Sequence, residues 1–332
     1  MQPKNSNTFM FILFATSIGL VLALGFFIAV MQAADPAFTF NAPMWALFLG
    51  SQLLVFGVPF GIYLLIHRDK IKEILPMRPL GGVNVLMVVG MSLLIQPLFM
   101  LVNLISQLLF PNVIIDAIVG VGQEGGFVLT LAIIAVVPSI FEEITFRGVG
   151  FAGYKHVKIR TAAIINGLMF GMIHMNMNQF IYAFVLGALF CYFMYYTKSL
   201  WAPVLAHFVF NGTQSLMAYA AINLDPYALY AADMPMDFTD IETVLAIGAL
   251  VIVALVFTGG FIAVYIAFKH HNLKRNKAEG IVTDTAAEHA AAGGPRPTVF
   301  TWAFWMVCGL FVLMMLGNYL LPLLATDLVG RL

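Results

Sequence analysis

The chain has 332 residues, of which 61% are apolar and only 10% are charged, and its mean hydropathy is +0.95. These values lie outside the range of soluble globular domains and predict an all-α, polytopic membrane protein. The formal net charge is zero and the basic clusters are short, which argues against nucleic acid as a partner and favours membrane lipids. Cys191 and Cys308 lie in separate apolar runs, so they predict neither a disulfide framework nor a thiolate metal site.

Apolar runs long enough to cross a bilayer recur along the whole chain, and they predict eight or nine transmembrane helices in one bundle. The first run is longer than the apolar region of a secretory signal, and no clear cleavage site follows it, so we expect it to remain as a helix. The expected spans are residues 8–31, 43–66, 82–110, 127–150, 161–177, 180–197, 199–221, 243–268 and 299–325.

The distribution of apolar and polar segments predicts four parts. They are an N-terminal two-helix membrane segment (1–80), a helical catalytic core (81–222, with its motifs in 125–222), an acidic extracytoplasmic loop (223–242) and a C-terminal two-helix segment (243–332). Residues 278–298 have low complexity and little apolar content, so within the last part they predict a flexible cytoplasmic linker.

The basic residues predict the orientation of the chain in the membrane. When nine spans are threaded, all Lys and Arg residues except Arg331 and Arg147, which lies inside a span, fall on one side, and the acidic loop falls on the other. By the positive-inside rule, the N-terminus of this multi-pass protein is expected in the cytoplasm. The residues on the basic side are Lys4, Arg68, Lys70, Lys72, Arg78, Lys155, Lys158, Arg160, Lys198, Lys269, Lys274, Arg275, Lys277 and Arg296.

Two carboxylates and a guanidinium lie inside the expected fourth span, at Glu142, Glu143 and Arg147. A charged residue at mid-bilayer depth costs at least about 2.5 to 3.5 kcal/mol, so this group needs partners, water or a function. On a helix Glu143 and Arg147 share one face and can pair, whereas Glu142 points about 100° away from Glu143. A carboxylate without an obligate cation can serve as a general base, so we expect the two acids to have different roles. The alternative is a structural ion-pair cluster that joins helices.

Two further polar groups follow in the next spans. His174 ends the run Phe170-Gly171-Met172-Ile173-His174, and His207 and Asn211 share one face of an otherwise apolar helix. At 1.5 Å per residue, Glu142, His174 and His207 lie about 20, 21 and 14 Å from the nearest basic residues of the cytoplasmic side. All of them can therefore reach one layer within the membrane, as a water-filled chamber would need.

These three motifs, E-E-x-x-x-R at Glu142 to Arg147, F-x-x-x-H at Phe170 to His174 and H-x-x-x-N at His207 to Asn211, resemble those of the CPBP family. That family comprises the type II CAAX prenyl endopeptidases and the Abi proteins associated with bacteriocin self-immunity. The resemblance covers roughly residues 125–222 and implies an all-helical intramembrane glutamic protease. By motif position it implies that Glu142 and His174 activate water and that His207 and Asn211 stabilise the oxyanion. Glu143, Arg147 and Phe170 are then expected to support these residues.

The chemistry of the residues leaves a zinc-dependent variant open, because Glu142, His174 and His207 could supply three ligands and leave a fourth position for water. We favour a mechanism without a cofactor, since the H-E-x-x-H helix is absent and pairing with Arg147 would weaken Glu143 as a base. Ser139 lies near the glutamates, but no neighbouring base marks it as a nucleophile.

The expected substrate is a peptide or a lipidated protein, cleaved near a membrane-associated or CAAX-like C-terminal segment. The rival hypothesis is a non-enzymatic protein, either an immunity or scaffold factor or a transporter whose buried charges relay protons.

Overall fold

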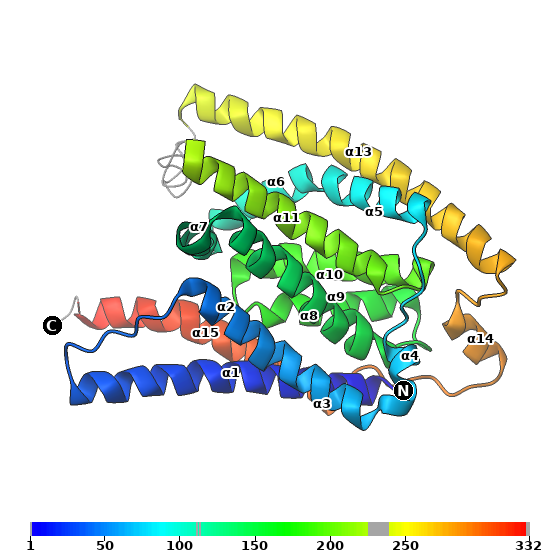
Figure 1. Ribbon diagram of the computed structural model, residues 1–332, viewed down its shortest axis with the longest axis horizontal. Helices are drawn as coiled ribbons and strands as arrows, with labels where there is room; N and C mark the ends of the chain where they lie inside the picture. Colours follow the sequence, from blue (N-terminus) through cyan, green and yellow to red (C-terminus); the bar gives the residue numbers. More distant parts are fainter. Residues whose placement is uncertain (1, 111, 113, 225–238, 330–332) are drawn as a thin grey trace.

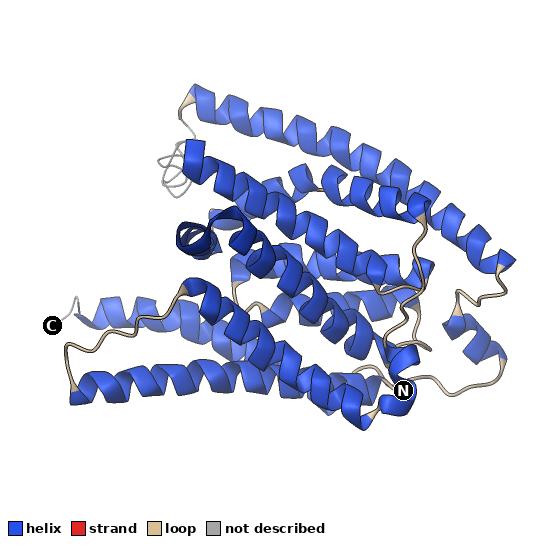
Figure 2. Ribbon diagram, in the orientation of Figure 1, coloured by secondary structure: helices blue, strands red, loops and turns tan. Residues whose placement is uncertain are grey.

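The computed structural model describes residues 2–110, 112, 114–224 and 239–329, and its regular secondary structure there is helical (Figure 2). An isolated antiparallel bridge joins Met77 to Ser199. The predicted all-α fold is therefore confirmed.

The helices follow one another with short connections. They are α1 (Pro3–Ala34), α2 (Met44–Ser51), α3 (Val58–Ile66), α4 (Ile71–Ile74), α5 (Gly82–Leu94), α6 (Gln96–Gln107), α7 (Ile114–Thr130), α8 (Val137–Glu143), α9 (Ile159–Ile173), α10 (Met177–Thr197), α11 (Trp201–Leu224), α13 (Ile241–Ala278), α14 (Thr285–Ala291) and α15 (Trp302–Val329). Three π-helical segments, η1 (Gln52–Gly57), η3 (Leu131–Val136) and η4 (Ile144–Gly150), and one 3₁₀ turn, η2 (Arg68–Lys70), complete the set.

Seven of the helical stretches in the described part of the chain are long and apolar enough to cross a membrane. Each of the nine expected spans is helical, but two do not meet these criteria. Helix α9 has only 15 residues, fewer than the roughly 20 that a span requires. Helix α11 has 24 residues, but polar residues such as His207, Asn211 and Gln214 lower its hydropathy. The chain is thus a polytopic helical bundle with seven candidate spans.

The centre of the bundle is formed by α8 to α11 (Figure 1). Helix α5 packs on α11 and α6 packs on α10, and both are covered by α13 along one side of the molecule, while α1 and α15 pack together along the opposite side. The stretch α2–η1–α3 contacts α8 and η4, so the N-terminal segment lies against the helix that carries the two glutamates. The four-part division of the chain stays a prediction.

Hydrogen bonds gather the predicted basic segments at one end of the bundle. Ser6 donates to the Val149 carbonyl at 3.0 Å, Arg78 to the Thr197 carbonyl at 3.1 Å, and Lys198 to the Thr283 carbonyl at 2.8 Å. The side of the membrane on which this end lies stays a prediction. Asp225, Asp233 and Asp237 of the expected acidic loop, and Arg331, lie outside the described residues.

The predicted linker 278–298 contains the short helix α14, which Asp284 caps by accepting a hydrogen bond from the Ala287 amide at 3.0 Å. The Thr285 hydroxyl donates to the Lys155 carbonyl, and the rings of His156 and His289 stack with centroids 4.3 Å apart. The segment is therefore attached to the turn before α9, whereas its flexibility stays a prediction.

Candidate active site

The two glutamates end α8, which lies between the π-helical segments η3 and η4. Pro138 has no N–H group, so it cannot donate to the carbonyl of Ile134 one turn earlier. The side-chain amide of Asn211 donates to that carbonyl at 3.0 Å. Because Pro138 leaves this carbonyl without its helical donor, Asn211 can bond it and is held beside α8. Single π-helical turns inside helices are frequent at functional sites.

Glu143 belongs to a buried ionic group. Its Oε1 atom accepts a hydrogen bond from the Arg147 guanidinium and another from Nδ1 of His207, each at 2.8 Å. The side chains of Glu143 and Arg147 are completely buried. The predicted pairing of Glu143 with Arg147 is therefore confirmed, and the contact with His207 adds a link from α8 to α11.

Aromatic rings enclose the Arg147 guanidinium. Its central carbon lies 4.3 Å from the centroid of the Phe170 ring and 5.2 Å from that of Phe190. A desolvated guanidinium over an aromatic face is attracted by the ring quadrupole. The Phe170 ring also meets the rings of His174 and His207 edge to face, with centroids 5.1 and 5.9 Å apart. Phe170 is thus in contact with one member of each of the other two motifs.

Glu142 has a different environment from Glu143. It is 7% exposed, and its Oε1 atom accepts a hydrogen bond of 2.9 Å from the side-chain amide of Gln52 in η1. His174 lies within electrostatic range of Glu142. Because Arg147 is bound to the neighbouring carboxylate, Glu142 faces a neutral amide and an imidazole.

Both histidines are held through the same ring nitrogen. Nδ1 of His174 lies 2.8 Å from the Phe170 carbonyl, and Nδ1 of His207 lies 2.8 Å from the Glu143 carboxylate. Carbonyl and carboxylate oxygens only accept, so each Nδ1 must carry the proton. In the neutral form of either ring Nε2 then has a free lone pair, and it becomes a donor when the ring takes up a second proton.

The exposed part of this cluster lies at His174 and Asn211, which are half-buried, whereas Glu142 and His207 are buried. A substrate would therefore approach from the side of His174 and Asn211. Direct contacts connect five of the seven motif residues, namely Glu143, Arg147, Phe170, His174 and His207. Glu142 bonds Gln52 instead, and Asn211 bonds the Ile134 carbonyl. The roles of all seven in a reaction stay predictions.

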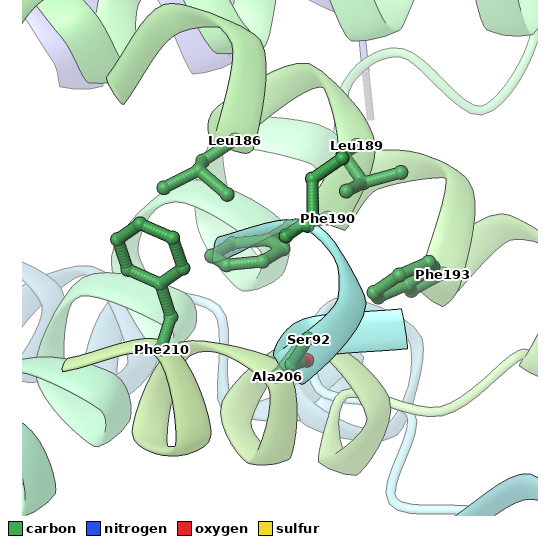
Figure 3. A pocket seen from close by; sticks show the side chains of 8 residues that line it. Ser92, Leu186, Leu189, Phe190, Phe193, Ala206 and Phe210 are labelled. Carbon is green, nitrogen blue, oxygen red and sulfur yellow. The ribbon is translucent and has the colours of Figure 1, made fainter. Parts of the chain in front are cut away.

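A narrow pocket lies next to this cluster, between α5, α10 and α11 (Figure 3). Its only polar side chain, Ser92, donates to the Val88 carbonyl of its own helix at 2.8 Å. Phe190 lines the pocket and places its ring centroid 5.6 Å from that of His207. The pocket therefore supplies an apolar wall behind His207 and no reactive group.

In the part of the chain that the structure describes, no group of three His, Cys, Asp or Glu side chains could hold a metal ion. The ligand set expected for the zinc variant, Glu142, His174 and His207, is therefore not gathered as a coordination site. Both histidines nevertheless present Nε2, the kind of atom that a metal would use. Chelation of the purified protein tests whether its activity depends on a metal.

Sequence reasoning missed two features of the site. The contact of His207 with Glu143 joins residues 64 positions apart, which no local pattern predicts. Gln52 is an amide inside an apolar span, and this polar residue at membrane depth was a signal that could have singled it out. The hydroxyl of Ser139 donates to the Val136 carbonyl at 2.9 Å, so its proton is bonded to a backbone oxygen rather than to a base.

Fold and site define a multi-pass helical membrane protein. Its candidate site combines two glutamates, an arginine and one histidine that are buried with a second histidine and an asparagine that are half-buried. Residues 124–213 match the family described as type II CAAX prenyl endopeptidase Rce1-like, and this range contains all three motifs. This segment of the chain is therefore similar to the type II CAAX prenyl endopeptidases, as its three motifs indicate.

A relative in Bacillus subtilis (strain 168), named "Putative membrane peptidase YdiL", is 29% identical over 84 residues. The alignment covers 25% of this chain and 34% of that relative, so the chain matches about a third of the relative's length. No solved structure matches the chain.

Proposed function

We propose that this protein is a membrane endopeptidase in which Glu142 and His174 activate a water molecule. The family match and the relative named as a membrane peptidase support a membrane protease in general. The observation that carries the finer proposal is the unequal environment of the two glutamates. Glu143 is bound to Arg147 and His207, whereas the hydrogen bond that Glu142 accepts within the described residues comes from the Gln52 amide.

In the proposed reaction, water lies between the Glu142 carboxylate and Nε2 of His174. Glu142 takes a proton from the water as the oxygen attacks the peptide carbonyl, and the same proton later passes to the leaving amine. His174 orients the water with its Nε2 lone pair, because its Nδ1 proton is committed to the Phe170 carbonyl.

The oxyanion of the tetrahedral intermediate needs donors that are already in place. Asn211 uses one amide proton for the Ile134 carbonyl and keeps the second for this purpose. His207 donates through Nε2 in its protonated form, while its Nδ1 is hydrogen-bonded to the Glu143 carboxylate. Glu143 and Arg147 thus act through His207 rather than on the substrate.

The proposed substrate is a peptide segment at the membrane, of which a CAAX-like C-terminus is one kind. The description of the matched family supports this substrate class. A zinc-dependent form of the same protease is the alternative mechanism, and a non-enzymatic immunity or scaffold role is the alternative function.

The test compares purified wild type with Glu142→Gln in detergent, using a farnesylated CAAX peptide and its unmodified counterpart, with mass spectrometry of the products. Glu124→Gln is the matched control, because Glu124 caps α2 at Met44 and Trp45, away from the cluster. We expect cleavage by wild type and by Glu124→Gln, none by Glu142→Gln, and no effect of a chelator.

Loss of cleavage on chelation, restored by zinc, would replace the cofactor-free mechanism with the zinc-dependent one. Cleavage of both peptides would remove the prenyl requirement. Cleavage by Glu142→Gln at the wild-type rate would refute the role of Glu142. If none of the proteins cleaves either peptide, the CAAX-like substrate fails and the scaffold function takes precedence.

A further inference from the structure

The N-terminal segment supplies a residue to the site, although it lies outside the segment that matches the family. Gln52 begins η1, 90 positions before Glu142, and donates to the Glu142 carboxylate at 2.9 Å. We propose that Gln52 is a positioning residue for Glu142, which holds this carboxylate in its reactive orientation without neutralising it. This inference rests on the function proposed above.

The helix face that carries Gln52 is directed toward the glutamates. Gln52, Val55 and Phe56 are buried, whereas Leu53 and Leu54 are 44% and 49% exposed on the outer face. An amide on the inner face of an apolar helix is costly unless it has a partner, and its partner here is Glu142. The carboxylate also fixes the orientation of the amide, because a flipped Gln52 would place oxygen against oxygen.

Close packing keeps η1 in position along α8 on both sides of this hydrogen bond. Gly57 lies so close to the Phe141 ring that a Cβ atom there would come within 2.8 Å of the ring carbon Cε1. Phe60 packs edge to face on Phe141 with centroids 5.5 Å apart, and Phe56 lies 6.3 Å from Phe146. These contacts therefore hold the backbone that carries Gln52 in a fixed position along α8.

A neutral donor suits a general base better than a cation would. An ion pair would stabilise the carboxylate so strongly that it would accept a proton poorly. An amide donor orients the carboxylate and does not neutralise its negative charge. The remaining titratable groups near Glu142 come from α8, η4, the end of α9, α10 and α11, and they are Glu143, Arg147, His174, Tyr182 and His207.

The first variant is Gln52→Met, which keeps the length of the side chain and removes the donor. The control is Asn84→Leu, which removes another buried amide, one that bonds Asn272 of α13 at 3.1 Å. We expect Gln52→Met to lower kcat about 10-fold to 100-fold with little change in KM, since a hydrogen bond to a charged group is lost. Asn84→Leu should keep the wild-type kcat. Gln52→Glu replaces the amide nitrogen by oxygen and should also lower kcat. This second variant tests the proposal if Gln52→Met does not fold.

A second readout does not depend on activity. The infrared difference between wild type and Glu142→Gln identifies the carboxylate stretching band of Glu142. That band should shift in Gln52→Met and stay in place in Asn84→Leu. An unshifted band together with wild-type kcat in both Gln52 variants would overturn the proposal. If no protein cleaves a peptide, wild type included, the proposed function fails, and the infrared band still decides whether Gln52 holds Glu142.

Discussion

Nδ1 of His207 donates to Oε1 of Glu143 across 2.8 Å and so joins α11 to α8. The same oxygen accepts from Arg147, so one carboxylate connects two of the three motifs. We therefore propose that the two adjacent glutamates differ in function, with Glu143 organising the site and Glu142 taking part in the chemistry.

Substitution of Glu143 should damage the fold, whereas substitution of Glu142 should damage activity alone. Glu143→Gln leaves the fully buried Arg147 without its counter-charge, and we expect a loss of about 3 to 5 kcal/mol of stability. The double variant Glu143→Gln with Arg147→Met removes both charges and should unfold later than Glu143→Gln alone. Thermal unfolding in detergent measures all three against wild type. Equal midpoints for Glu142→Gln and Glu143→Gln would contradict this assignment.

Two substitutions of His207 should separate its two ring nitrogens. His207→Asn keeps an amide donor near the position of Nδ1, so the link to Glu143 and the fold should survive. The variant lacks a group at the position of Nε2, and removal of an oxyanion donor lowers kcat by about 10²-fold to 10³-fold. His207→Gln places its amide nearer to Nε2 and should lose stability instead. Wild-type kcat in His207→Asn, measured beside its unfolding midpoint, would exclude His207 from the reaction.

Pro138 and Asn211 should be coupled through the Ile134 carbonyl. Pro138→Ala restores a backbone N–H that competes with the Asn211 amide for this carbonyl, so Asn211 should lose its fixed position. We expect a lower kcat together with equal or greater thermal stability. The activity loss in the double variant Pro138→Ala with Asn211→Ala should not exceed that of Asn211→Ala alone. Full additivity of the two losses would show that the residues act independently.

Low pH should loosen the attachment of residues 281–298. Burial holds the pKa of His156 below its usual 6.5, and the nearby His289 and Lys155 charges add to this effect. Because the folded-state pKa is lowered, the unfolded or detached state binds more protons as the pH falls through 6.5 toward the folded value. The stability of the attachment is therefore complete above that range and is lost within it.

Hydrogen exchange of residues 281–298, corrected for the intrinsic dependence on pH, measures this loosening between about pH 7 and pH 5.5. His156→Phe keeps a ring that can stack on His289 and cannot be protonated, so it should remove the dependence. An equal dependence in this variant and in wild type would assign the effect to another group.

Local spacing was enough to predict part of the site. Glu143 and Arg147 lie four positions apart on one helical stretch, so their pairing follows from helix geometry alone. The apolar runs likewise predicted the positions of the helices, because a helix needs about 20 apolar residues to cross a bilayer. Of the eight or nine expected spans, seven meet the criteria of length and hydropathy in the described residues, because α9 is short and the polar residues of α11 lower its hydropathy.

The sequence by itself determined the all-α membrane class, the three motifs and the ion pair within one helix, because each depends on residues near one another in the chain. Only the tertiary structure decided which glutamate meets His207, which carbonyl holds Asn211, and that Gln52 of η1 bonds Glu142. These contacts join positions 64, 77 and 90 residues apart. Their geometry depends on how the helices pack, and periodicity within a helix does not encode the rotation of one helix against another.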